Sequence, residues 1–193
     1  MYRRGLLRIA MLVMVAALAG CAQTSQELRL APRAELGDSA VGDNVTVAVT
    51  VEDPRSDPGL GQLSNGSADP VPLTSATPPR YLVRAAVEKA LTSSGFTIAD
   101  SGDAAARLTV IIDSIDHRVS AGVPRDITTN VALTARAQRD GRELGNEASV
   151  RRTDTSVLRP DAEANARYLD AAIGRALERL LNDETLALLA GDA

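Results

Sequence analysis

The dipeptide Asp140-Gly141 constrains the fold more than any other feature of this sequence. It favours a two-residue type I′ turn, and such a turn determines which residues of the two flanking strands lie opposite each other. Arg136 is then placed diagonally between Glu143 and Glu147 on one face of the hairpin. The opposite face is apolar throughout, with Ala137 facing Leu144, Leu133 facing Ala148 and Val131 facing Val150.

Three further strands are predicted upstream of this hairpin. Apolar residues alternate with small or polar ones from Val45 to Val51, as in a half-buried strand. A short strand is predicted over 96–99. Near the start of 107–119, apolar residues occupy both odd and even positions and therefore both faces of a strand. This pattern predicts a central strand covered on both sides.

A helix is predicted between the first two of these strands. Thr77 suits the N-cap position, and Pro78 suits the first helical position. Gly95 is expected to end the helix in the left-handed conformation, which allows Phe96 to pack back on Leu91 in a Schellman motif.

A second helix is predicted near the end of the chain, followed by a last amphipathic turn around Leu186 and Leu189. The predicted order is β-α-β-β-β-β-α. This order indicates an α+β fold with two helices packed on a mainly antiparallel sheet. The apolar stripe of the second helix consists of Leu169, Ala172, Ile173, Ala176, Leu177, Leu180 and Leu181.

The segment 55–77 is rich in Gly, Pro, Ser and Asp and shows no periodicity. We therefore expect a long loop. Loops of this length inside a compact domain are usually functional or mobile, so this segment is the first candidate for a binding surface.

The first residues have the order of a secretory signal. Arg3, Arg4 and Arg8 precede an apolar run that is too short to span a membrane. The run ends at 18–21 in Leu-Ala-Gly-Cys, which resembles the lipobox of bacterial lipoproteins. We expect cleavage between Gly20 and Cys21 and acylation of Cys21, including palmitate. The alternatives are an ordinary signal peptide with a chance cysteine and a lone buried thiol.

The expected domain organisation follows from this cleavage site. Residues 1–20 form a lipoprotein signal peptide, 21–43 a lipidated tether, and 44–193 a single α+β periplasmic domain. Alanine rather than aspartate at position 22 favours the outer membrane. Removing 1–20 removes three arginines and no acidic residue, so the net charge changes from −4 to −7. The membrane is therefore expected as a partner through lipid, and nucleic acid is not expected.

The residues offer little material for catalysis. His117 is the single histidine, so a hydrolase would have to combine it with a nearby Ser and Asp. The other interpretation of His117 is a solvated histidine at the end of a strand. No nucleophile elbow, Walker motif or dinucleotide fingerprint is present, and we expect no enzyme activity and no cofactor.

Four aspartates are candidates for a carboxylate cluster that binds Ca²⁺ or carries out acid/base chemistry. Their spacing lacks the regular alternation of an EF-hand loop, so turn-forming roles are favoured and no metal site is expected. They are Asp53, Asp57, Asp113 and Asp116.

The sequence resembles the YajG-type family of uncharacterised bacterial lipoproteins. The resemblance rests on the lipobox, the strand 45–51 leading into Val-Glu-Asp-Pro-Arg, the helix end at 91–96, the Asp140-Gly141 hairpin and the segment 180–183. It implies an envelope lipoprotein without an assigned reaction, and it carries no functional residues.

The sequence is compatible with two classes of function. The first is a non-enzymatic binding or scaffolding module that contacts an envelope protein, glycan or lipid through 55–77. A variant of this class is an auxiliary lipoprotein of an ABC-type transport system. The second class is an envelope hydrolase that uses His117.

Overall fold

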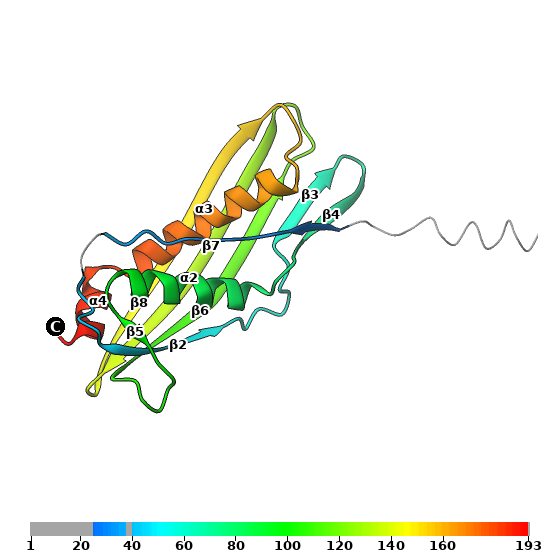
Figure 1. Cartoon of the computed structure of the whole chain (residues 1–193). Helices are drawn as coiled ribbons and strands as arrows, with labels where there is room; N and C mark the ends of the chain where they lie inside the picture. The colour runs from blue at the N-terminus through cyan, green and yellow to red at the C-terminus, as the bar shows by residue number, and fades with distance from the viewer. Residues whose placement is uncertain (1–24, 38–39, 193) are drawn as a thin grey trace, which may run out of the picture.

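The computed structural model describes residues 25–37 and 40–192 of the 193-residue chain. These residues form an eight-stranded sheet with three helices packed on one face (Figure 1). The elements are β1 (Gln26–Leu28), β2 (Thr46–Glu52), β3 (Gly61–Asn65), β4 (Ala68–Ser75), α2 (Pro79–Ser93), β5 (Thr97–Ile98), β6 (Ala106–Val119), β7 (Arg125–Arg139), β8 (Arg142–Ser156), α3 (Ala162–Leu180) and α4 (Asp183–Ala190).

Strand β6 lies at the centre of the sheet. Along one edge it pairs antiparallel with β7, which pairs antiparallel with β8. Its other edge is shared by two parallel neighbours, because β2 pairs with 106–111 and β3 pairs with 117–119. The sheet is therefore mixed, which corrects the predicted mainly antiparallel sheet. The predicted order and the number of two helices are also wrong, because β1, β3, β4 and α4 are additional elements.

The predicted hairpin is confirmed. Asp140 and Gly141 have φ of 51° and 77°, as a type I′ turn requires. Every apolar pair predicted between β7 and β8 lies opposite its partner in the structure. Arg136 lies opposite Gly145, and Glu143 accepts a hydrogen bond from Gln138 at 2.9 Å.

This turn yields a test with a matched control in the adjoining strand β8. Gly141→Val should destabilise the protein by about 1–3 kcal/mol, because a β-branched residue is strained at positive φ. Gly145→Val should cost little, since Gly145 has open space around its Cβ position and an ordinary φ. Chemical denaturation of both variants measures the difference. Equal stability of the two would contradict the turn type.

A β-bulge between Ile112 and Ser114 changes which residues of β6 face the helices. Ile112 and Ile115 are both buried in the core, although residues three positions apart face opposite sides of a regular strand. Ile111 is only half-buried, on the face without helices. The prediction that β6 is covered on both sides is therefore wrong, and the inserted residue accounts for the burial of Ile115.

Helix α2 ends as predicted. Gly95 has φ of 87°, and the amide of Phe96 donates to the carbonyl of Leu91 at 3.1 Å, which is the long hydrogen bond of a Schellman motif. The start differs by one residue, because Pro78 occupies the N-cap position and Pro79 is the first helical residue.

The segment 55–77 is mostly folded, which corrects the expected long loop. It contains the antiparallel pair β3 and β4, which is joined at Gly66. Leu60, Leu63 and Leu73 from this segment are buried in the main core. Few apolar residues fall on each short strand, so the sequence shows no periodic pattern here.

Replacing 57–72 with a short Gly-Ser linker should therefore prevent folding. The replacement removes two buried leucines, and truncating even one such residue costs about 2–5 kcal/mol of a total of about 5–15. Leu63→Ala should destabilise by about 2–4 kcal/mol. Its exposed neighbour provides the control, since Gln62→Ala should have little effect. Thermal unfolding tests all three variants, and a linker variant with a normal melting temperature would contradict the packed arrangement.

The described part of the predicted 21–43 tether is also folded. Strand β1 pairs in parallel with β4, and Leu28, Leu30 and Pro32 are buried at alternate positions. The chain then runs between α2 and α3 (Figure 1). A Cβ at Gly174 of α3 would collide with the carbonyl of Arg33, so this close approach requires glycine. Residues 26–36, which belong to the predicted tether, are therefore packed against the rest of the domain.

Candidate functional site

The predicted cleavage and lipidation residues, Gly20 and Cys21, lie outside the described residues. The structure describes the chain from Ser25 onward, four residues after Cys21. What it adds is the position at which any N-terminal anchor joins the folded domain. That position is the start of β1, beside the N-terminal end of α3.

A buried polar cluster holds β1 at this position. His117 of β6 and Asn165 of α3 are both 0% exposed. The imidazole Nε2 contacts Asn165 Oδ1 at 3.0 Å, and Nδ1 contacts Thr129 Oγ1 at 2.8 Å. The amide nitrogen of Asn165 donates to Gln26 Oε1 at 2.8 Å. One side chain of α3 thus connects the first strand to the centre of the sheet.

These contacts define the protonation of the imidazole. The amide nitrogen of Asn165 also points at the carbonyl of Pro160, 3.4 Å away, which can only accept. Asn165 therefore presents its oxygen to Nε2, which must carry the proton, and Nδ1 accepts from the Thr129 hydroxyl. Burial lowers the pKa of His117 below its ordinary value, while the bond to Asn165 and the charge of Asp116 oppose this shift.

The predicted solvated, strand-end position of His117 is therefore wrong. The sequence did contain a signal for burial, because Ile115, His117 and Val119 alternate on one face of β6. The partners of the imidazole are a threonine and an asparagine instead of the serine and aspartate of the hydrolase hypothesis. Asp116 lies on the other face of the strand and pairs with Arg118 at 2.9 Å.

Stability should fall as the pH decreases below about 6.5, the ordinary pKa of histidine. The unfolded chain binds the proton first, because the pKa of His117 is lowered in the folded protein. Above about 6.5 the imidazole is neutral in both states and the full stabilisation is present. Urea denaturation between about pH 8 and 5.5 measures this dependence.

The matched variant for this test is His117→Gln, which keeps a hydrogen-bonding side chain but does not titrate. It should be less stable than the parent at pH 8, and its stability should depend less on pH between 8 and 5.5. The same pH dependence in both proteins would show that another group is responsible.

The four aspartates do not form a cluster. Asp53 forms a two-point ion pair with Arg55 at 2.7 and 2.8 Å, and this bond lowers the pKa of Asp53. Asp57 accepts from the amide of Gly59 at 2.8 Å, which is the predicted turn-forming role. Asp113 accepts from Thr134 at 2.8 Å. Within residues 25–37 and 40–192, no group of three or more His, Cys, Asp or Glu side chains is placed to bind a metal ion.

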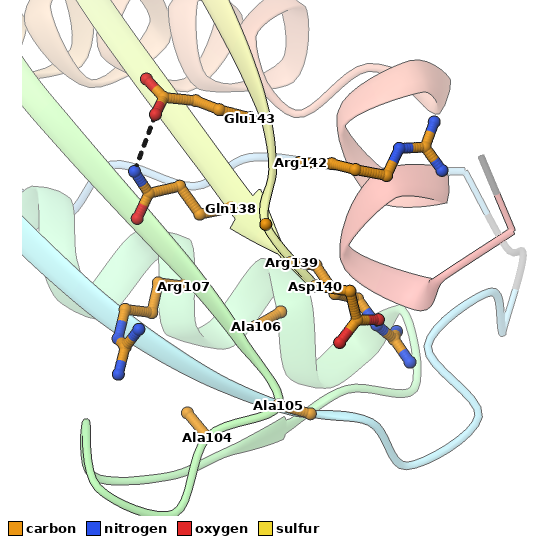
Figure 2. A pocket seen from close by; sticks show the side chains of 10 residues that line it. Ala104, Ala105, Ala106, Arg107, Gln138, Arg139, Asp140, Arg142 and Glu143 are labelled. Carbon is orange, nitrogen blue, oxygen red and sulfur yellow. Dashed lines mark hydrogen bonds and ion pairs between the residues drawn. The ribbon is translucent and has the colours of Figure 1, made fainter.

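A shallow cavity of about 280 Å³ lies at the other end of the sheet (Figure 2). It is formed by the β7–β8 turn and by residues 104–107 at the start of β6. Arg107 and Arg142 are exposed on its rim, and Glu143 is held by Gln138. Arg139 beneath the turn donates to the carbonyl of Leu189 at 2.6 Å, which ties α4 to the hairpin. The cavity is open and lined mainly by polar side chains.

The helices of the described residues are too short or too polar to cross a membrane. A family model described as "Uncharacterized lipoprotein" matches residues 32–189. No curated protein matches the chain.

Solved structures are similar to this chain at low sequence identity. Protein XCC0632 of Xanthomonas campestris is 14% identical with a TM-score of 0.55, over 87% of this chain and 93% of that one. Lipoprotein GNA1162 of Neisseria meningitidis is 14% identical with a TM-score of 0.36, over 68% of this chain and 96% of that one. A dodecamer of PelC from Paraburkholderia phytofirmans is 15% identical with a TM-score of 0.38, over 78% and 94%. The similarity to XCC0632 extends to the fold alone.

Proposed function

Because the chain belongs to a family of uncharacterised lipoproteins, we propose that it is acylated at Cys21 and anchored in the outer membrane with its domain in the periplasm. We assign it the role of a non-enzymatic binding or scaffolding module. The observation that carries this role is the fold of residues 26–36, which are packed into the domain directly after the lipobox. Such an arrangement suits a protein that holds a binding surface at a defined place near a membrane.

The cavity end of the domain is the surface we assign to a partner. Strand β7 runs the length of the sheet, and its 15 residues correspond to about 45 Å. The anchor joins one end of this length, and the β7–β8 turn lies at the other. Segment 55–77, the first candidate from the sequence, contributes its leucines to the core and is therefore a less suitable contact surface.

The buried state of His117 supports a non-enzymatic role. A general base must come within hydrogen-bond distance of a substrate proton, and both ring nitrogens of His117 already have protein partners. No contact in the described part of the chain favours the hydrolase alternative.

Replacing Cys21 with Ser should abolish palmitate incorporation and leave an uncleaved precursor, because a hydroxyl is a far poorer nucleophile than a thiolate. Labelling with palmitate and separation of membranes by density measure both effects. The parent protein should be found with the outer membrane. Ser25→Ala provides the control, since it changes a hydroxyl residue close to the site and should be processed normally. Palmitate label in the Cys21→Ser variant would exclude this anchor.

The partner surface can be tested with a photo-crosslinking residue in intact cells. Placed at Arg142, beside the cavity, it should capture one defined envelope component. Placed at Ala85, on the exposed face of α2, it should not. Capture at position 85 alone would assign the contact to the helical face and contradict the proposed surface.

A further inference from the structure

Exposed apolar side chains gather at one end of the domain. Among the described residues, four large hydrophobic side chains are exposed, and three of them are Val123, Val157 and Leu158, at 73%, 71% and 77%. Val123 lies in the β6–β7 turn, and the other two begin the β8–α3 connection. Arg125 pairs with Ser156, so these two segments leave the sheet side by side (Figure 1). Single exposed apolar residues are ordinary, whereas a group at one tip indicates a contact surface.

This apolar tip lies beside the start of β1. The amide nitrogen of Asn165 contacts both the side chain of Gln26 and the carbonyl of Pro160. Leu158 precedes Pro160 by two residues, and Cys21 precedes Gln26 by five. The strand pairing places the tip and the anchor at the same end of the sheet. Strand β1 runs opposite to β6, so the chain before Gln26 points in the direction of Val119 and the β6–β7 turn.

The length of the connecting chain limits how far the tip can lie from the acyl chains. Five fully extended residues reach about 17 Å. Thr129, which pairs with His117, lies four residues from Arg125 at the end of the sheet, and this distance is about 13 Å. A lipid on Cys21 therefore cannot hold this domain at a distance, and the end of the sheet must lie near the lipid headgroups.

We propose that the apolar tip of Val123, Val157 and Leu158 inserts into the surface of the membrane that carries the Cys21 lipid. This inference rests on the anchoring described under the proposed function. The aliphatic side chains enter the boundary between headgroups and acyl chains, about 5–10 Å deep. Arg159, which is exposed beside the tip, reaches the lipid phosphates, whereas the guanidinium of Arg125 donates to the carbonyl of Ser120 at 3.0 Å. Two of the nearby acidic side chains are engaged, since Asp154 pairs with Arg152 and Asp161 caps α3, and the exposed Asp126 faces solvent at this end.

Tip insertion adds a second attachment to the lipid anchor and orients the domain. With the tip in the membrane, the long axis of the sheet points away from the bilayer, and the cavity at the β7–β8 turn is presented to the periplasm. An anchor alone would leave the orientation of the domain free.

The absence of tryptophan from the sequence allows a direct test. Leu158→Trp places a single fluorophore at the tip, and Arg142→Trp places the control at the opposite end. Each lipidated protein is reconstituted in vesicles of phosphatidylethanolamine and phosphatidylglycerol containing lipids brominated on their acyl chains. Leu158→Trp should show a blue-shifted emission and at least about twofold more quenching than Arg142→Trp, as expected for insertion at this depth. Equal quenching at both positions would overturn the proposal.

Two further measurements separate this result from its alternatives. If Cys21 is not acylated in cells, the proposed anchoring fails, and its thiol, the single cysteine of the chain, is then coupled to a maleimide lipid in the same vesicles. Equal quenching in that preparation overturns tip insertion independently. A blue shift of Leu158→Trp that appears without vesicles and grows with protein concentration would assign the tip to contact between two copies of the chain and also overturn the proposal.

Discussion

The structure depends on how strand β6 divides one of its edges between two neighbours. Its first half pairs with β2, and its last three residues pair with β3. A strand of 14 residues is long for a globular protein, and this length allows two separate units to add to the same edge. One unit is β2 with β5, and the other is β3 with β4 and β1. The bulge after Ile112 bends β6 between these two units and turns Ile115 toward the core.

The N-terminal segment depends on the second of these units. Strand β1 has only three residues, so three parallel pairs with β4 contribute little by themselves. The segment is held because Leu28 is buried, because Asn165 donates to Gln26, and because Ala31 donates to Asp170 at 2.9 Å. Burial raises the pKa of Asp170, although this hydrogen bond favours its charged form. Helix α3 thus supplies two side-chain hydrogen bonds that help to hold the N-terminal residues in the domain.

The elements found from the sequence are those whose signals are local. The Asp140-Gly141 turn, the Schellman end at Gly95 and the long amphipathic helix each depend on residues within a few positions of one another. Strands β1, β3 and β4 lack such signals, because their partners lie far away in the sequence and each contributes only one or two core residues. The position of His117 was misjudged for a different reason. Its polar side chain suggested a solvated position. Ile115 and Val119, however, lie on the same face of β6 as His117, and this pattern indicated the core. Two polar partners, Thr129 and Asn165, make that burial possible.

The buried cluster at His117 also determines how closely the domain can follow its anchor. With β1 in place, five residues separate Cys21 from the folded domain, and the reach is about 17 Å. If the segment came away from α3 as far as Gly37, 16 residues would separate them, and the reach would rise to about 55 Å. At that length the apolar tip could move well clear of the membrane. The hydrogen bonds that join Asn165 to His117 and Gln26 therefore connect the central strand to the N-terminal segment, and under the proposed anchoring the orientation of the domain at the membrane depends on them. A protein that only needed attachment would not require residues 26–36 to be folded, whereas one that presents a surface at a fixed height does.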